Sequence, residues 1–588
     1  MNVMKTLSLK KAMSLLALLV ASLPLAAQEE QTESALSREL TLEREYNPSV
    51  QDANKVNTLP DIKDPVVTRM SVDYALLSTP ADPKREIGLL PAEPILADMT
   101  YNHRRGYVNA GIGSSLNING DIGYHILSTG KDQLNVFLSH RSTAGDRKYT
   151  EGFLKGESVK ARVNDNLGGL DFRHAFDRSV LHLGAKYVYS SFNYYGLPSP
   201  NVLSVWPAPV VDTETNQLRR IFTTNAGVES RGVHPLGYLL DGNYTHFSYL
   251  YAWDESMKGI TEQTLSTRVK LYARLGADKQ AGVDAGFNYF FYNLPDYSTS
   301  GFKNYLETTL TPYFRAEGDF WNLRLGANLM FITSTERNPA KFFLSPHAGI
   351  DVNAGAKTVI YLKADGGIRS NSAYQLSVEN RYTDPYRSAT PSTTPLDAVL
   401  GVRTGIVSGL HFHLFGQYKV TDDDYFFVPY LSSEGFGNLS RVLSQDFRLL
   451  RGGVELKYSF RDLFGLSFRG IYNRWNEEAD EEGGEFVKRK AYGRPWAELT
   501  AGALIHPTGK LALALDYYLA VGRKALVNNT RIVDMNDVCE LDFTASYTFS
   551  ETFGVYVKMN NLLFRSYEFI YGYPLQGFGV MGGINMNF

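Results

Sequence analysis

Gly577–Phe588, with the sequence GFGVMGGINMNF, ends the chain, and its apolar side chains recur at every second residue. Successive side chains of a β-strand point to opposite faces, so this alternation predicts two different surfaces. One face suits hydrocarbon and consists of Phe578, Val580, Gly582, Ile584, Met586 and Phe588. The other face contains asparagine, glycine and methionine, which suits a polar interior. The stretch therefore predicts a strand with lipid on one side.

The same pattern recurs from about residue 105 onward. In 265–275, 360–369 and 553–560, aliphatic residues alternate with tyrosine, lysine, arginine and other polar residues. A lysine or arginine on the lipid face near the bilayer midplane would cost roughly 2–4 kcal/mol, so the charged set should face the lumen. After the first 27 residues, no stretch of about 18 apolar residues follows, which leaves a closed barrel as the way to span lipid.

Counting the alternating segments predicts an all-β fold, a transmembrane antiparallel barrel of about 22 strands. An even number is typical of single-chain bacterial barrels. The expected spans are 105–115, 117–127, 132–143, 158–175, 179–195, 217–231, 238–253, 262–276, 281–295, 304–318, 323–335, 342–355, 359–371, 398–407, 410–426, 445–460, 466–477, 494–506, 511–525, 537–550, 553–567 and 577–588.

The links between these segments provide an independent check. Every second link is tight, from 128–131 to 551–552, whereas the intervening links after the first are mostly longer, such as 196–216 and 372–397. Short turns belong on the periplasmic side of bacterial barrels and long loops outside. The phase of the links agrees with this rule when both termini lie in the periplasm.

The chain divides into three expected parts. Residues 1–27 place lysines before an apolar run and two alanines, which is typical of a secretory signal peptide. Residues 28–104 are charged and rich in proline, and they lack sustained alternation, so an extended or irregular periplasmic segment is expected, with a short strand at 69–77. Residues 105–588 form the expected barrel.

The last hairpin carries a set of residues that resembles a known family. These residues are Asn561, Leu562, Tyr567, Gly572, Tyr573, Pro574 and Phe588. In this order they are similar to the end of the TonB-dependent receptors of Gram-negative bacteria. The detailed resemblance covers about the last 35 residues, and the architectural one covers 105–588. It implies a receptor-type barrel in the outer membrane, and a terminal aromatic, Phe588, that the barrel-insertion machinery reads.

One part of the family's pattern is not recognisable. Receptors of this family carry a plug domain of well over a hundred residues, and 28–104 is shorter and lacks its glycine-rich pattern; Leu40–Leu42 is only a weak candidate for a TonB box. A barrel of 22 strands encloses a cylinder roughly 40 Å across. The lumen must therefore be filled by residues 28–100, by inward-folded loops or by another polypeptide. For the first case, the expected contacts join Glu43, Glu45, Asp61 and Asp64 to Arg268, Lys270 and Lys363.

The sequence predicts no catalytic, cofactor or metal site. The acidic runs Glu477–Glu485 and Asp422–Asp424 lack the spacing of a calcium loop and are expected to be solvated. His411 and His413 share one face of a strand, which a strand end at the interface explains. The apolar loop Val202–Val211 is a partner contact, a lumen filler or a packed loop. Cys539 is the only cysteine, so there is no disulfide.

Two functions remain open from the sequence. The first is transport of a large nutrient across the outer membrane, and the alternative is a plugless scaffold subunit of an assembly or secretion complex. An enzyme is not expected, because no residue constellation supports one. The net charge of −3 gives no basis for nucleic-acid binding. The expected partners are outer-membrane lipid and the insertion machinery, with a surface lipoprotein or periplasmic protein as a further candidate.

Overall fold

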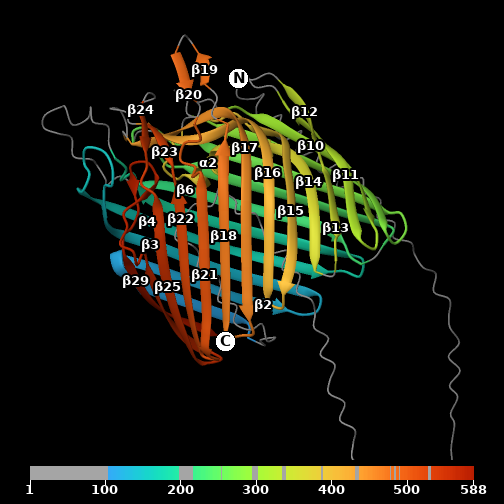
Figure 1. The fold of residues 1–588 in the computed structure, drawn as a ribbon, viewed down its shortest axis with the longest axis horizontal. Coiled ribbons are helices and arrows are strands. Elements are labelled where there is room, and N and C mark those ends of the chain that lie inside the picture. The colour runs from blue at the N-terminus through green and yellow to red at the C-terminus, as the bar shows by residue number, and fades with distance from the viewer. Residues whose placement is uncertain are drawn as a thin grey trace, which may run out of the picture. The chain divides into compact units, whose positions relative to one another are not determined.

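The computed structural model describes residues 104–588, apart from 198–215, 233, 253–254, 295–301, 334–339, 356, 386–387, 431–435, 437, 477–478, 483–484, 489 and 528–530. Within them, neighbouring strands pair antiparallel around one closed barrel (Figure 1). Its last strand, β29 (Gly579–Asn587), pairs with its first, β1 (Gly106–Gly113). The wall holds 22 strands, which confirms the predicted fold class and count.

The wall strands have the following bounds. After β1 come β2 (Asn117–Ser128), β3 (Asp132–Lys148), β4 (Ser158–Ala175), β5 (Ser179–Asn193), β6 (Asn216–Ser230), β7 (Leu236–Tyr249), β8 (Thr261–Arg274), β9 (Lys279–Asn293), β10 (Tyr305–Glu317), β11 (Trp321–Ile332), β12 (Lys341–Pro346) with β13 (Ala348–Asn353), β14 (Thr358–Arg369), β15 (Ser392–Val407), β16 (Leu410–Tyr430), β17 (Leu439–Phe460), β18 (Phe464–Trp475), β21 (Ala497–Thr508), β22 (Leu511–Val521), β25 (Val538–Ser550), β26 (Phe553–Asn560) and β29.

Most predicted spans differ from the observed strands by only a few residues, and the larger differences have local causes. The twelfth strand is split into β12 and β13, which both pair with β11, on either side of His347. The preceding residue, Pro346, has no N–H to give to the ladder. The pairing of β16 with β17 reaches Tyr430 and Leu439, several residues further than expected, across a register shift between Thr421 and Asp424.

The loops contain elements that the alternation did not predict. One is a short helix, α2 (Ala373–Glu379), and another is a turn of 3₁₀ helix, η2 (Ser114–Leu116). Three small hairpins complete the set: β19 (Ala479–Glu482) with β20 (Glu485–Lys488), β23 (Lys524–Val527) with β24 (Arg531–Asp534), and β27 (Glu568–Ile570) with β28 (Tyr573–Pro574). Among the described residues, no helix is long and apolar enough to cross a membrane.

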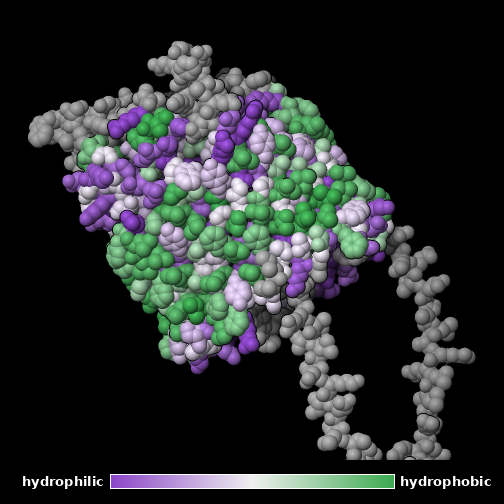
Figure 2. Space-filling model, viewed as in Figure 1, coloured by the Kyte–Doolittle hydropathy of each residue, from purple (hydrophilic) through white to green (hydrophobic). Residues whose placement is uncertain are grey.

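The outer wall is apolar where the alternation predicted lipid. Leu271 is 57% exposed on β8, and on β14 Leu362 is exposed while its neighbour Tyr361 is buried. On the last strand the exposed apolar side chains include Val580, Ile584 and Met586. Figure 2 shows apolar side chains covering much of the wall, with hydrophilic ones gathered toward its upper rim. The arrangement fits a band of hydrocarbon around the barrel.

Short and long links lie at opposite ends of the barrel, as predicted. The C-terminus lies at the short-turn end, where Asn587 N donates to Thr552 O at 2.9 Å. The hairpins β19–β20 and β23–β24 lie at the long-loop end (Figure 1). That the short-turn end faces the periplasm remains a prediction.

Phe588 closes the seam between the first and last strands. Its backbone N donates to Gly106 O at 2.9 Å and its carbonyl accepts from Gly106 N at 2.8 Å. Its exposed ring stacks 6.2 Å from that of Tyr124 on the outer wall. These contacts place the terminal aromatic on the face that must reach lipid.

Deletion of Phe588 should lower the amount of barrel in the outer membrane. The deletion removes the last two hydrogen bonds of the seam and the aromatic that the insertion machinery is expected to read. The measurement is the quantity of protein in the outer-membrane fraction, with Phe588→Tyr as a matched control that keeps ring and backbone. Equal amounts of the deletion variant and the wild type would contradict the assignment.

Candidate functional site: the lumen cap

A buried cluster rich in aromatic residues lies at the long-loop end of the barrel. We call the inward-folded loops that form it the lumen cap: the described residues of 370–391, residues 194–197 and the last loop, 561–578. Side chains of several wall strands pack against them. The buried cluster comprises Tyr149, Val159, Ala161, Phe192, Tyr194, Tyr195, Leu197, Ile221, Phe247, Tyr249, Ile260, Phe290, Tyr292, Phe302, Tyr305, Ile332, Ala373, Leu376, Tyr382, Tyr425, Leu439 and Tyr573.

Helix α2 begins the inward loop 370–391. Ser372 caps it, because its hydroxyl accepts a hydrogen bond from Gln375 N at 3.3 Å. Ala373, Leu376 and Ser377 are buried in the cluster. A helix of seven residues is marginal in water by itself, so these tertiary contacts hold it.

Two buried glutamates of the wall anchor the start of this loop. Glu262 on β8 accepts a hydrogen bond from Tyr374 N at 3.0 Å. Glu307 on β10 accepts from the Ser370 hydroxyl at 2.7 Å. Tyr305 then donates to Ser370 O at 2.9 Å. Buried carboxylates need hydrogen-bond donors, and the loop backbone supplies one to Glu262 and a hydroxyl supplies one to Oε2 of Glu307, whereas Oε1 of Glu307 has no partner.

The end of α2 and the residues after it are held by strands on another part of the wall. Arg381 makes two hydrogen bonds to Asp165 on β4, at 3.1 and 3.3 Å. Arg219 on β6 donates to Ser377 O, and Tyr249 on β7 donates to Arg381 O at 3.3 Å. The loop thus bridges strands that are far apart in the sequence, and it crosses the lumen.

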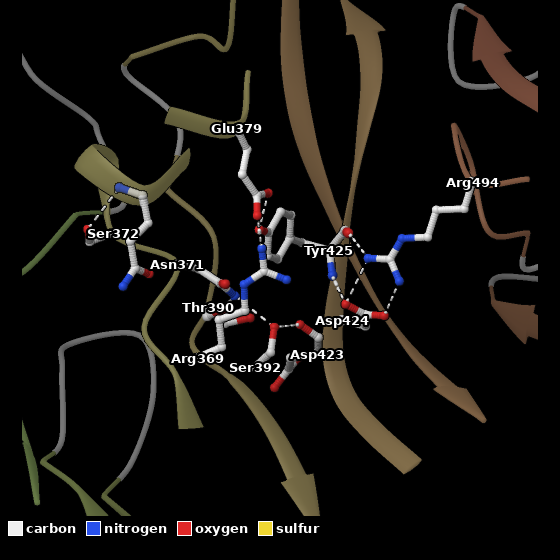
Figure 3. Close-up of polar contacts among 11 residues, drawn as sticks. Arg369, Asn371, Ser372, Glu379, Thr390, Ser392, Asp423, Asp424, Tyr425 and Arg494 are labelled. Atoms are coloured by element: carbon white, nitrogen blue, oxygen red, sulfur yellow. Dashed lines mark hydrogen bonds and ion pairs between the residues drawn. The ribbon is translucent and has the colours of Figure 1, made fainter. Parts of the chain in front are cut away.

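A polar network joins α2 to β14 and β16 (Figure 3). Glu379 at the end of α2 forms an ion pair with Arg369, and it also accepts a hydrogen bond from the Tyr425 hydroxyl. Close by, Arg494 forms an ion pair with Asp424 at 2.8 Å and donates to Tyr425 O at 2.9 Å. Burying charges costs desolvation energy, but the low local dielectric strengthens ion pairs and hydrogen bonds between them.

The backbone of the loop also pairs with the start of β17. Ser440 N donates to Tyr382 O at 2.8 Å, and Asp384 N donates to Ser440 O at 2.7 Å. Thr383 and Ser440 form an isolated parallel bridge, and both are buried. The cap is therefore fastened by main-chain hydrogen bonds as well as by side chains.

Apart from Phe588 at the seam, the six residues that carry the family resemblance lie in the last loop, and three of these six contact the rest of the cap. The ring of Tyr573 stacks on that of Tyr382 at 3.8 Å and 14°, and the Tyr573 hydroxyl donates to Asn438 O at 2.9 Å. Gly572 O accepts from Leu197 N at 2.8 Å, and Pro574 O accepts from Tyr195 at 3.3 Å. The Gly-Tyr-Pro turn thus packs into the centre of the cap.

The other three residues of the resemblance shape the start of the last loop. The expected strand 553–567 is wrong in its second half, because β26 ends at Asn560. Asn561 has φ 53°, and its amide accepts from Arg565 N and donates to Arg565 O. Asparagine tolerates this left-handed conformation better than most residues. Leu562 N donates to Leu541 O, and Tyr567 is buried against Ala520 and Val538.

Glu568 anchors the middle of the last loop and predicts a pH dependence. It accepts hydrogen bonds from the Thr150 hydroxyl and Gly572 N, and burial raises its pKa above the ordinary 4.5. The carboxyl of Glu568 therefore stabilises the folded loop fully at a pH below its pKa in the unfolded chain. This stabilisation is lost as the pH rises through its higher pKa in the folded loop. We expect slower amide exchange in 561–578 at pH 5 than at pH 8, after correction for intrinsic rates. Glu568→Gln should remove this difference, and an unchanged difference in that variant would contradict the role.

The lumen wall also holds a polar hollow nearer the short-turn end. It has a volume of about 420 Å³ and is lined by residues of β3 to β7, including Asp171, Arg173, His182, Asn225, Glu229 and Asp241. His182 pairs with Glu229 at 3.0 Å. The volume of the hollow is at the lower end of the range for small-ligand sites, and its lining has both hydrogen-bond donors and acceptors.

The other sequence candidates have ordinary structural roles or lie outside the described residues. His413 contacts the Tyr361 hydroxyl at 2.7 Å and Glu455 at 3.2 Å. Lys270 pairs with Asp284 at 3.0 Å. The loop 202–211, residues 28–103, and the side chains of the acidic hairpin 477–485 are not described. No group of three or more potential metal ligands occurs in the described part of the chain.

Sequence reasoning missed most of the cap. Residues 372–397 were expected to be a long link only, although Ser372 and Gln375 have the Ser-x-x-Gln spacing of a helix start. The anchors Glu262, Glu307 and Asp165 lie in strands whose alternation predicts that these side chains face the lumen. The alternation does not predict their partners. No local signal identified their contacts.

No family model matches this chain, and no curated protein matches its sequence. Solved structures are similar to it. The siderophore receptor PirA from Acinetobacter baumannii has 11% identity and a TM-score of 0.62, with 83% of this chain and 81% of that chain covered. The fold is the 22-stranded barrel of the TonB-dependent receptors.

Two further structures of this fold are equally distant in sequence. The FrpB iron transporter from Neisseria meningitidis has 10% identity and a TM-score of 0.62, with 82% of each chain covered. The copper transporter OprC has 12% identity and a TM-score of 0.59, with 82% of this chain and 80% of that chain covered. At this identity the likeness shows the receptor-type barrel fold alone, because one fold can serve many functions.

Proposed function

We propose that this protein is an outer-membrane transport barrel of the receptor type, which passes a large nutrient through its lumen, with both termini in the periplasm. The solved proteins of this fold include a siderophore receptor, an iron transporter and a copper transporter. A lumen roughly 40 Å across is wide enough for a large nutrient.

The observation that carries the proposal is that loops at the long-loop end fold inward and contact several wall strands. The cap consists of loops that are joined to the wall by ion pairs and hydrogen bonds, such as Arg381–Asp165 and Glu379–Arg369. The wall strands pair with one another all the way around the barrel, so the sheet is closed without any contribution from the cap. A stopper that is separable from the wall is what a regulated passage requires.

A scaffold subunit of an assembly or secretion complex is the second candidate. The packing of the cap favours it, because the central rings of Phe192, Tyr382 and Tyr573 are buried together. Each buried aromatic stabilises the closed state, and a permanently closed barrel would suit a structural role. A surface lipoprotein or a periplasmic protein would then be the partner.

A disulfide that locks the cap separates the two functions. Bridge partners on neighbouring backbone segments lie about 4.8 Å apart, within the reach of a disulfide. Thr383→Cys with Ser440→Cys, in a Cys539→Ala background, therefore joins loop 370–391 to β17. Under oxidising conditions we expect at least about tenfold slower growth on the transported nutrient in a panel of single nutrients, and recovery on reduction.

The two single-cysteine variants are the matched controls and should grow as the wild type does. If the oxidised double variant grows as fast as the single-cysteine variants on every nutrient, transport through an opening cap is excluded and the scaffold role is favoured.

A further inference from the structure

The barrel wall is unusually low on both sides of its seam. β1 and β26 have 8 residues each and β29 has 9, whereas β16 and β17 have 21 and 22. A membrane-spanning strand needs about 9–11 residues. The wall at the seam is therefore just tall enough, or slightly too short, to cross the hydrocarbon core.

The strand registers show where this low section begins and ends. β2 pairs with β3 only as far as Ser142, and the remaining residues of β3, 143–148, pair with β4 alone. On the other side, β26 meets β25 first at Phe543, so residues 538–542 pair with β22 alone. Above β26, β29, β1 and β2 the wall thus has a notch, bounded by the upper edges of β25 and β3.

The last loop, 561–578, fills this notch and is fastened at both of its edges. At the β25 edge, Leu562 N donates to Leu541 O at 2.8 Å. At the β3 edge, Gln576 accepts hydrogen bonds from Asn117 at 3.1 Å and Arg147 at 3.3 Å, and it donates to Ser115 at 3.4 Å. Gln576 is the latch that joins the last loop to β2, β3 and the turn between β1 and β2.

The outside of the notch is apolar up to its edge. Ile112 is 64% exposed, and Leu116 in the turn is 66% exposed. On the loop itself, Phe564 is 70% exposed and stacks on Phe578 at 4.7 Å. Exposed aromatic and aliphatic side chains of this kind are typical of the bilayer interface. An opening at the notch would therefore lead into lipid rather than into water.

The lumen side of the strands beneath the notch is mainly polar, with Met581 and Tyr556 among its side chains. Asn119, Asp121, Arg141 and Lys558 lie on the lumen side of the strands beneath it, opposite in direction to the exposed Ile118 and Ile122. The same last loop reaches the centre of the cap through the stacked rings of Tyr573 and Tyr382. Movement of one loop would loosen both the cap and the notch.

We propose that the last loop is a lateral gate, and that the cargo is an amphiphile whose polar head passes the lumen while its acyl chains pass the notch into the bilayer. This inference rests on the proposed transport function and specifies its substrate class. The combination of a polar lumen side, an apolar outer side and a separable loop between them matches the two halves of such a molecule.

Photo-crosslinking to lipid tests the gate. The photoreactive residue p-benzoylphenylalanine replaces Asn119, on the lumen wall below the notch, or Gln417, on the lumen wall of β16, and the full-length protein is placed in vesicles of radiolabelled phosphatidylcholine. We expect several-fold more lipid crosslinked at position 119 than at 417. Gln576→Ala, which removes the latch, should raise the yield at 119 further and leave 417 unchanged.

A closing variant completes the test. Leu541→Cys with Leu562→Cys, in a Cys539→Ala background, locks the other edge of the last loop, because the backbones of these two residues are joined by a hydrogen bond of 2.8 Å. When oxidised, this variant should lower the yield at 119 to that at 417, and reduction should restore it. Equal yields at both positions, or no response of position 119 to the latch variants, would overturn the gate. If the Thr383–Ser440 lock stops uptake while lipid crosslinking stays flat, transport stands and the lateral route fails. If lipid enters but the lock changes no growth, the transport proposal fails separately.

Discussion

Replacement of residues 372–389 by a short glycine–serine linker should make cells sensitive to large antibiotics that the outer membrane normally excludes. The linker can close the gap because Arg369 and Ser392, at the ends of β14 and β15, are paired. The replacement removes Tyr382, Arg381 and helix α2, which cross the lumen. We expect a fall of about tenfold or more in the inhibitory concentration of vancomycin, because an open lumen roughly 40 Å across does not exclude this antibiotic.

The matched control is removal of the hairpin β19–β20, whose two strands pair with each other. Its removal should leave the inhibitory concentration unchanged at equal surface levels of protein. If the cap replacement also leaves it unchanged, the lumen is closed by something other than the cap. Residues 28–100 would then be the first alternative, as the sequence suggested, and their deletion would be the next measurement.

Tyr382→Ala should destabilise the closed cap by about 3–5 kcal/mol, the usual cost of truncating a buried aromatic ring. Tyr382 is 8% exposed, and its ring packs on those of Tyr573, Tyr195 and Phe192. Hydrogen exchange of residues 370–391 should become faster by about two to four orders of magnitude if exchange proceeds through cap opening. Exchange in the strands of the wall should not change.

Tyr382→Phe is the control, because it keeps the ring and removes only the hydroxyl. Its exchange rates in the cap should stay within about tenfold of the wild type, since a single hydrogen bond contributes about 1 kcal/mol. An equal effect of both variants would mean that the hydroxyl, rather than ring packing, holds the cap. No effect of either would mean that Tyr382 does not stabilise the closed state.

Much of the wall could be predicted from the sequence because its information is local. The direction of a side chain such as Leu271 or Lys270 follows from its parity in the strand, and lipid penalises a charge on the wrong face. The phase of short and long links fixed the strand count in the same local way. The errors fell where a local conformation ends a strand, as at Asn561, whose left-handed backbone stops β26.

The sequence by itself determined a closed barrel of 22 strands, because alternation at period two is repeated in every strand and only a closed sheet satisfies its backbone in lipid. The tertiary structure alone decided how the lumen is closed and how low the wall is at the seam. The cap depends on pairs such as Asp165 with Arg381 and Asn438 with Tyr573, which are 216 and 135 residues apart. The notch depends on the registers of four neighbouring strands. No repeating sequence pattern encodes the cap or the notch, because both arise from contacts that exist only after the barrel has closed.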